Sequence, residues 1–262
     1  GRQGQDFAYI FSVGMGGMES LYKDGKEWLY RAPRPAFWRA ATDNDRGNGF
    51  VFLSAVWSSA DRFVRCVKVT ARMDEQEISM PPAPESNKYN GDETCDRFEI
   101  SYTYETPTVP VTEVTVSYLV ESDGRIHVQV DYLGKQGLPE LPVFGMRFLM
   151  PTAAERYTYE GLSGETYPDR MAGGIHGVYE VQGLPVTPYM VPQDCGMHMQ
   201  TKWLEIVRKT SLDNTDRGGR SSRLKITAEE GKDFAFSCLP YTAQELENAM
   251  HHEELPPARR TV

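Results

Sequence analysis

Residues 111–120 read VTEVTVSYLV and residues 125–133 read RIHVQVDYL, and these two segments decide the fold class. Apolar and polar side chains alternate in both, so that Val114, Val116 and Tyr118 share one face of the first segment. An alternation with a period of two is typical of a half-buried β-strand. The four residues between the segments, ESDG, end in a glycine, as hairpin loops often do. The two segments therefore predict a β-hairpin.

Similar strand signals recur along the whole chain, whereas helical signals are few. The dipeptide Asp24-Gly25 is a typical hairpin turn. A capping-box pattern, TAQE, begins a helix at Thr242, and a weaker helix signal covers Phe50–Asp61. Further strands are expected at Phe7–Val13, Glu27–Arg31, Phe63–Ala71, Phe98–Tyr104, Phe144–Met150, Lys202–Val207, Arg223–Thr227 and Phe234–Leu239.

Many strands with one or two short helices predict an all-β protein, built as a large antiparallel β-sandwich. The polar, proline-rich stretch Met80–Asn90 has strand signals on both sides, so we interpret it as a loop within the sandwich. A single sandwich domain over residues 1–262 is therefore expected.

Composition excludes several classes of function. The formal net charge is -9 and the pI is near 5.2, which argues against nucleic-acid binding because phosphate contacts need clustered lysine and arginine. No apolar run approaches 18 residues, so no membrane span is expected. The four cysteines lack C-x-x-C spacing, which argues against a cysteine metal site.

Residues 34–49, RPAFWRAATDNDRGNG, mix aromatic, basic, acidic and amide side chains without a period. The acids and amide at 43–45 suit Asx turns, and the glycines that follow suit positive φ. The stretch predicts an ordered loop pinned by Phe37 and Trp38.

Three segments, taken in order, carry a family resemblance. Phe37–Gly47 reads FWRAATDNDRG, Glu165–Arg170 reads ETYPDR, and Pro188–Gly196 reads PYMVPQDCG, with Trp203 shortly after. Together with the late helix and the two histidines that follow it, they resemble the lacZ-type β-galactosidases of glycoside hydrolase family 2. The resemblance covers essentially the whole chain.

The resemblance implies the C-terminal, galactose-mutarotase-like sandwich of a retaining enzyme that hydrolyses terminal β-D-galactosides such as lactose. Its two catalytic glutamates lie on a TIM barrel, and this sequence has no strand–helix alternation to build one. We therefore expect no catalytic residue here and no activity of the chain alone. The sequence ends before the family's glycine-rich stretch with its sugar-site tryptophan, so a sandwich truncated at its C-terminal end is expected.

The partners that the resemblance implies are the barrel and the other domains of a homo-oligomeric parent, together with its galactoside. A single-chain and a two-chain parent are both open, as are a cytoplasmic and a periplasmic location. No cofactor is expected in this chain, although the parent family uses Mg and Na.

Loops at the rim of a sandwich carry function more often than strands do. The candidate sugar-facing residues are Asp43, Asn44, Asp45, Glu165, Asp169 and Arg170. The alternative is that both loops only stabilise the fold and its contact with the barrel. Asp43, Asp45 and Glu165 offer oxygen ligands that suit Mg²⁺, but no metal ligand is assigned.

Two other functions are open. A mutarotase-like epimerase needs a histidine acid and a carboxylate base, and His176 and His198 lie in loop-rich stretches. A stand-alone carbohydrate-binding module needs exposed aromatic rings. The ETYPDR and PQDCG segments favour the galactosidase over both alternatives.

Overall fold

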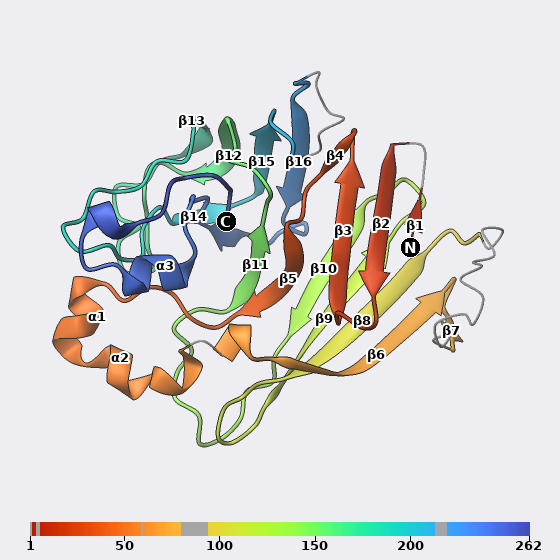
Figure 1. The fold of residues 1–262 in the computed structure, drawn as a ribbon, viewed down its shortest axis with the longest axis horizontal. Coiled ribbons are helices and arrows are strands. Elements are labelled where there is room, and N and C mark those ends of the chain that lie inside the picture. Colours follow the sequence, from red (N-terminus) through yellow and green to blue (C-terminus); the bar gives the residue numbers. More distant parts are fainter. Residues whose placement is uncertain (1, 4–5, 59, 80–93, 213–218) are drawn as a thin grey trace. The chain divides into compact units, whose positions relative to one another are not determined.

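The structure is a computed structural model that describes residues 2–3, 6–58, 60–79, 94–212 and 219–262. Antiparallel strands dominate and the helices are short, which confirms the expected all-β class (Figure 1). The loop expected at Met80–Asn90 lies outside the described residues.

The chain forms two compact units, and the prediction of a single domain over residues 1–262 stays a prediction. The segments of the first unit, which we call unit 1, are Gly1–Tyr22, Ala32–Trp38 and Ser54–Arg147. The segments of the second, unit 2, are Lys23–Arg31, Arg39–Leu53 and Phe148–Val262.

The largest sheet of unit 1 has five antiparallel strands in the order β10-β9-β8-β6-β7 (Figure 1). Its strands are β6 (Arg65–Met73), β7 (Gln76–Ile78), β8 (Phe98–Glu105), β9 (Glu113–Val120) and β10 (Ile126–Asp131). A four-stranded sheet in chain order contains β1 (Arg2–Gln3), β2 (Phe7–Ser12), β3 (Gly17–Lys23) and β4 (Lys26–Glu27), and a two-stranded sheet pairs β5 (Arg31–Ala36) with β11 (Gly145–Leu149).

The predicted hairpin is confirmed as β9 and β10, with Val116 opposite Val130. The inward face of β9 is closed to water, since Val116 is 0% exposed and Tyr118 is 1% exposed. Burying an apolar side chain such as that of Val116 contributes about 1.5–3 kcal/mol, so this face stabilises unit 1. The outward side chains of β8 and β9 form a hydroxyl ladder, in which Ser101 and Ser117 are bonded at 2.8 Å.

Unit 2 contains a four-stranded antiparallel sheet in the order β13-β12-β15-β16. Its strands are β12 (Arg156–Leu162), β13 (His176–Gln182), β15 (Trp203–Arg208) and β16 (Ser222–Thr227), and a separate pair joins β14 (His198–Thr201) to β17 (Phe234–Phe236). Rings of Tyr157, Tyr159, His198 and Phe236 pack together, with centroids 4.5–5.9 Å apart for the pairs that include His198.

The helices are short, and α1 and α3 each begin with a capping box. They are α1 (Asp43–Asn48), α2 (Phe50–Leu53), α3 (Ala243–Asn248) and the 3₁₀ turns η1 (Ala55–Trp57), η2 (Ala60–Arg62) and η3 (His252–Glu254). The capping box predicted at Thr242 is confirmed, because its side chain accepts from the Glu245 amide. Within the described residues, the helices are too short and too polar to cross a bilayer.

Two local predictions are wrong. Glu27–Arg31 is not one strand: β4 ends at Glu27, whose carboxylate accepts from the Leu29 amide, and Trp28 is 0% exposed beneath the guanidinium of Arg208. A fully buried tryptophan in this turn overrides the strand pattern. The loop expected over the acids at 43–45 is the helix α1, because Thr42 and Asp45 form a capping box.

Candidate functional site

The first signature segment is held by a bidentate ion pair within unit 2. The Arg39 guanidinium donates to the Asp45 carboxylate at 2.5 and 3.1 Å, and the same carboxylate accepts from the Thr42 amide at 2.9 Å. Burial on its own raises the pKa of Asp45, but the hydrogen bonds from Arg39 and Thr42 outweigh it and hold that pKa below its ordinary value. Asp45 therefore acts as the structural anchor of α1.

The Pro188–Gly196 segment is fastened to α1 across 150 residues of sequence. The buried Gln193 side chain accepts from the Asp43 amide at 2.8 Å, and Arg46 donates to the Pro192 carbonyl at 3.4 Å. Because Gln193 satisfies an amide in the first turn of a helix, it acts as a long-range cap.

A small apolar core lies under these contacts. Ala40, Cys195, Leu239 and Leu246 are each at most 4% exposed and pack in one cluster. Burial raises the pKa of the Cys195 thiol to about 11, so this cysteine is a packing residue and not a nucleophile. Glu247 of α3 accepts from the Ala41 amide at 2.5 Å, which ties the late helix to the same segment.

The ETYPDR segment contains a carboxylate held by several donors. Glu165 accepts from the hydroxyls of Tyr167 and Thr187, both at 2.5 Å. Burial alone raises the pKa of Glu165, but these hydroxyls and the Gly196 amide hold it below its ordinary value. A carboxylate bound in this way stays ionised near neutral pH and has little tendency to act as an acid.

The Tyr167–Arg170 turn carries the exposed end of this segment. The Arg170 amide donates to the Tyr167 carbonyl at 2.9 Å, and the Arg170 guanidinium lies 5.3 Å from the centroid of the Tyr167 ring. Pro168, Asp169 and Arg170 are exposed. The turn is therefore rigid at its base and open to solvent at its tip.

The signature segments converge on Arg39. Burial on its own lowers the pKa of Arg39, but the carboxylates of Asp45 and Asp194 outweigh it and hold that pKa above its ordinary value. Asp194 therefore lies within electrostatic reach of the Arg39 guanidinium. The Tyr167 hydroxyl also reaches the Asp194 carbonyl at 3.5 Å. We call Arg39, Asp45, Glu165, Tyr167, Gln193 and Asp194 the motif cluster.

The six candidate residues have different positions in the structure. Asp45 and Glu165 lie inside the motif cluster, while Asp43 and Asn44 are exposed on α1 and Asp43 faces Arg46 at 3.4 Å. Asp169 and Arg170 are exposed at the tip of the turn. Whether any of them faces a sugar stays a prediction. The sequence interpretation missed Arg39, Thr187, Gln193 and Glu247, although the first three lie in or beside the signature segments.

The two histidines of the epimerase alternative are placed differently. His198 is 6% exposed, and its ring nitrogens contact the Gly164 carbonyl at 2.8 Å and the Tyr157 hydroxyl at 3.2 Å. Burial lowers the pKa of His198, which favours its neutral form. His176 is exposed and contacts Gln200 at 2.8 Å. A histidine committed to packing is a poor proton donor, so this geometry does not favour the epimerase.

The candidate metal ligands of the sequence, Asp43, Asp45 and Glu165, all lie among the described residues. No group of three or more His, Cys, Asp or Glu side chains there is arranged to hold a metal ion. The Asp45 oxygens are already used by Arg39 and Thr42. Asp43, Asp45 and Glu165 therefore form no such group in the part of the chain that the structure describes, and the absence of a metal from this chain stays a prediction.

Residues 3–262 match the family model for the beta galactosidase small chain. The chain is 58% identical to a "Beta-galactosidase small subunit" from Latilactobacillus sakei, over 100% of this chain and 82% of that protein. It is 33% identical to "Beta-galactosidase BgaC" from Bifidobacterium adolescentis over 99% of this chain, and 31% identical to a "Beta-galactosidase" from Streptococcus thermophilus over 97% of this chain. In both of these longer proteins the match spans 22% of the relative's length.

Proposed function

Because this chain belongs to the β-galactosidase small-chain family, we propose that it is the small-subunit component of a β-galactosidase whose catalytic groups lie on a separate, larger chain. One observation carries the proposal. The chain spans most of a relative named as a small subunit, but only about a fifth of relatives named simply as β-galactosidases. The natural interpretation is one enzyme architecture, encoded either as one long chain or as two.

The chemistry that we propose for the assembled enzyme is that of a lacZ-type retaining glycosidase. One carboxylic acid protonates the leaving oxygen of a β-galactoside, and a second carboxylate attacks the anomeric carbon to form a galactosyl–enzyme that water then hydrolyses. Two carboxyl groups about 5–5.5 Å apart perform these steps, and we place both on a TIM barrel of the larger chain. We place neither of them on this chain.

Metal ions enter this proposal only through the larger chain. The Mg and Na that the family resemblance implies need clustered oxygen ligands. Since the described residues hold no group of three or more His, Cys, Asp or Glu side chains that could hold a metal ion, we derive no step of the reaction through a metal on this chain.

We further propose that the Tyr167–Arg170 turn docks against the larger chain beside its sugar pocket. The motif cluster fixes the base of this turn, so little conformational entropy is lost when the tip is buried. Among the described residues Arg170 takes part in no ion pair, and an arginine preorganised on a tyrosine ring is typical of interface hot spots. Its partner would be a carboxylate or carbonyl of the larger chain.

Co-purification and activity assays test both the subunit assignment and the docking of the Tyr167–Arg170 turn. The chain alone should not hydrolyse an aryl β-galactoside, whereas co-expression with its larger chain should give a complex that does. Arg170→Ala should weaken association about tenfold or more, while Arg223→Ala, an exposed arginine of β16, should leave it unchanged. Hydrolysis that purifies with the chain alone would contradict the subunit assignment, and equal effects of the two substitutions would contradict the docking site.

A further inference from the structure

The outward face of the five-stranded sheet in unit 1 carries an aligned row of side chains, one from each strand. The register places Glu77 of β7 opposite Arg72 of β6, Arg72 opposite Glu99 of β8, Glu99 opposite Leu119 of β9, and Leu119 opposite His127 of β10. Neighbouring strands lie about 4.7–4.9 Å apart, so the row places acidic, basic and apolar groups within reach of one small molecule.

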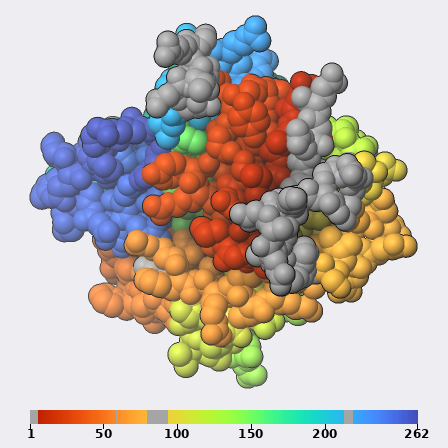
Figure 2. Space-filling model, turned by 45° about the vertical axis from the view of Figure 1, so that its right-hand side comes forward, coloured from red at the N-terminus to blue at the C-terminus, as the bar shows by residue number. Residues whose placement is uncertain are grey.

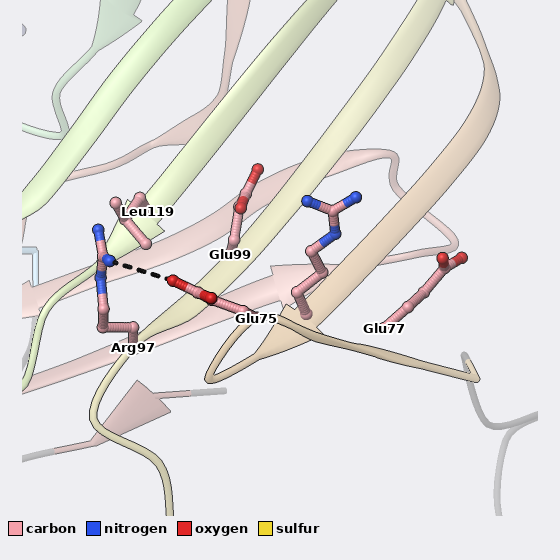
Figure 3. Close-up of a pocket in the computed structure, with 6 residues that line it drawn as sticks. Glu75, Glu77, Arg97, Glu99 and Leu119 are labelled. Atoms are coloured by element: carbon pink, nitrogen blue, oxygen red, sulfur yellow. Dashed lines mark ion pairs between the residues drawn. The ribbon is translucent and has the colours of Figure 1, made fainter.

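Part of this row lines a depression with a volume of about 530 Å³. Its lining residues are Arg72, Glu75, Glu77, Arg97, Glu99 and Leu119. Figure 3 shows Glu75, Glu99 and Leu119 around the same space, with Arg97 beside Glu75. The orange and yellow residues of this part of the chain reach the surface at the right of Figure 2. The volume is in the range of small-molecule sites, which is about 300–1,000 Å³.

The rim of the depression is held in place by its own backbone. The Asp74 carboxylate accepts from the amides of Asp96 and Arg97, both at 2.9 Å, and the Asp74 amide donates to the Arg97 carbonyl at 3.0 Å. These bonds tie the β6–β7 turn to the start of β8. The side chains of Glu75 and Arg97, 3.9 Å apart, therefore project from a preorganised frame.

Three of the five charged side chains that line the depression are free of ion pairs in the part of the chain that the structure describes. Among the described residues Arg72, Glu77 and Glu99 form no ion pair within 4.0 Å, although they are cross-strand neighbours of opposite charge. A carboxylate only accepts hydrogen bonds and a guanidinium only donates them. The lining thus presents both kinds of group beside one apolar side chain.

We propose that this depression binds a neutral mono- or disaccharide. A sugar hydroxyl both donates and accepts, so a polyol can satisfy the carboxylates and the guanidinium groups together. Three glutamates and two arginines leave a formal charge of -1, which favours neither an anion nor a strong cation. Leu119 offers an apolar surface to the C–H face of a sugar ring.

Titration of the full chain with lactose, followed by NMR of the protein amides, tests the proposal. We expect saturable shifts in β6, β8 and β9, with a dissociation constant of about 1–10 mM because the site is open. Arg72→Gln and Glu99→Gln should each weaken binding about tenfold, the loss of a charge-assisted hydrogen bond. Lys68→Gln, on the outward face of β6 beyond the depression, is the control and should bind as the unchanged chain does.

Maltose is the second probe, and its binding at the same amides would support a general sugar site. The absence of a saturable shift with lactose would overturn the proposal. Equal lactose binding by the Arg72→Gln and Lys68→Gln variants would also overturn it, as would shifts that arise with citrate or free lysine and not with sugars. Because the readout is binding to this chain, it is independent of the proposed galactosidase activity. A chain that binds lactose without ever supporting hydrolysis would refute the subunit proposal and leave this one standing.

Discussion

Replacing Asp45 with Asn should destabilise unit 2 by about 2–3 kcal/mol. Breaking a buried ion pair costs about 3–5 kcal/mol and breaking an exposed one about 0–1 kcal/mol. The Asp45 and Arg39 side chains are 10% and 25% exposed, so their pair lies nearer the buried limit but is discounted for solvent. The Asn oxygen can still accept from the Thr42 amide, so most of the capping bond survives and the loss comes from the uncompensated Arg39 charge.

Urea unfolding followed by tryptophan fluorescence measures this loss. The matched control is Asp43→Asn, two residues away, whose exposed carboxylate faces Arg46 at 3.4 Å and should change stability by less than about 0.5 kcal/mol. In an Arg39→Met background, Asp45→Asn should cost much less than it does alone, because the pair is already broken. Equal small losses for the two Asp substitutions would show that the ion pair does not anchor α1.

Two further substitutions should change the stability of unit 1 in opposite directions, and a third should change how stability depends on pH. Tyr118→Phe removes a buried hydroxyl that has no hydrogen-bond partner among the described residues, and it should stabilise unit 1 by up to about 1 kcal/mol. Tyr104→Phe loses a 2.6 Å hydrogen bond to the Gly16 carbonyl and should destabilise unit 1 by about 1 kcal/mol. Thermal unfolding of both variants checks these values, and a large loss of stability for Tyr118→Phe would contradict the first. Burial lowers the pKa of His198 in the folded state, so the unfolded chain binds the extra proton first and stability should fall as pH drops from about 6.5. His198→Gln should flatten this slope in urea titrations at several pH values, and an unchanged slope would exclude His198 as its source.

Much of the architecture of unit 1 could be predicted from local pattern. The alternation in residues 111–133 predicts both the β9–β10 hairpin and the buried face that contains Val116 and Tyr118. The capping box at Thr242 likewise predicts α3. Such features are local, because a strand period or a cap depends on side chains within a few residues of one another.

Of the two features that were missed, one depends on a tertiary contact and the other on a local cap. The acids at 43–45 are compatible with Asx turns and with a helix, and the helix forms where Arg39 and Thr42 both bind Asp45. The expected strand at Glu27–Arg31 gives way to a turn in which Trp28 packs beneath Arg208, a contact across 180 residues. The partner of Trp28 could not be identified from spacing, whereas Thr42 and Asp45 have the local spacing of a capping box that the sequence interpretation did not use.

The predictions for the candidate site divide in the same way between local features and features that depend on contacts distant in sequence. The order of the signature segments suggests that they act together, but their meeting point at Arg39 depends on contacts such as that between the Asp43 amide and Gln193. The sugar-site proposal depends on register in the same way. Alternation alone places Glu99 on an outward face, whereas its alignment with Arg72 and Leu119 requires the pairing of three strands.

Titration of the purified larger chain with this chain, with aryl β-galactoside hydrolysis as the readout, tests the central claim most directly. If this chain is the small subunit, neither chain alone hydrolyses the substrate, and the rate rises to a plateau at one copy of this chain per larger chain. Hydrolysis by this chain alone, or a larger chain whose full rate is unchanged by its addition, would contradict the account.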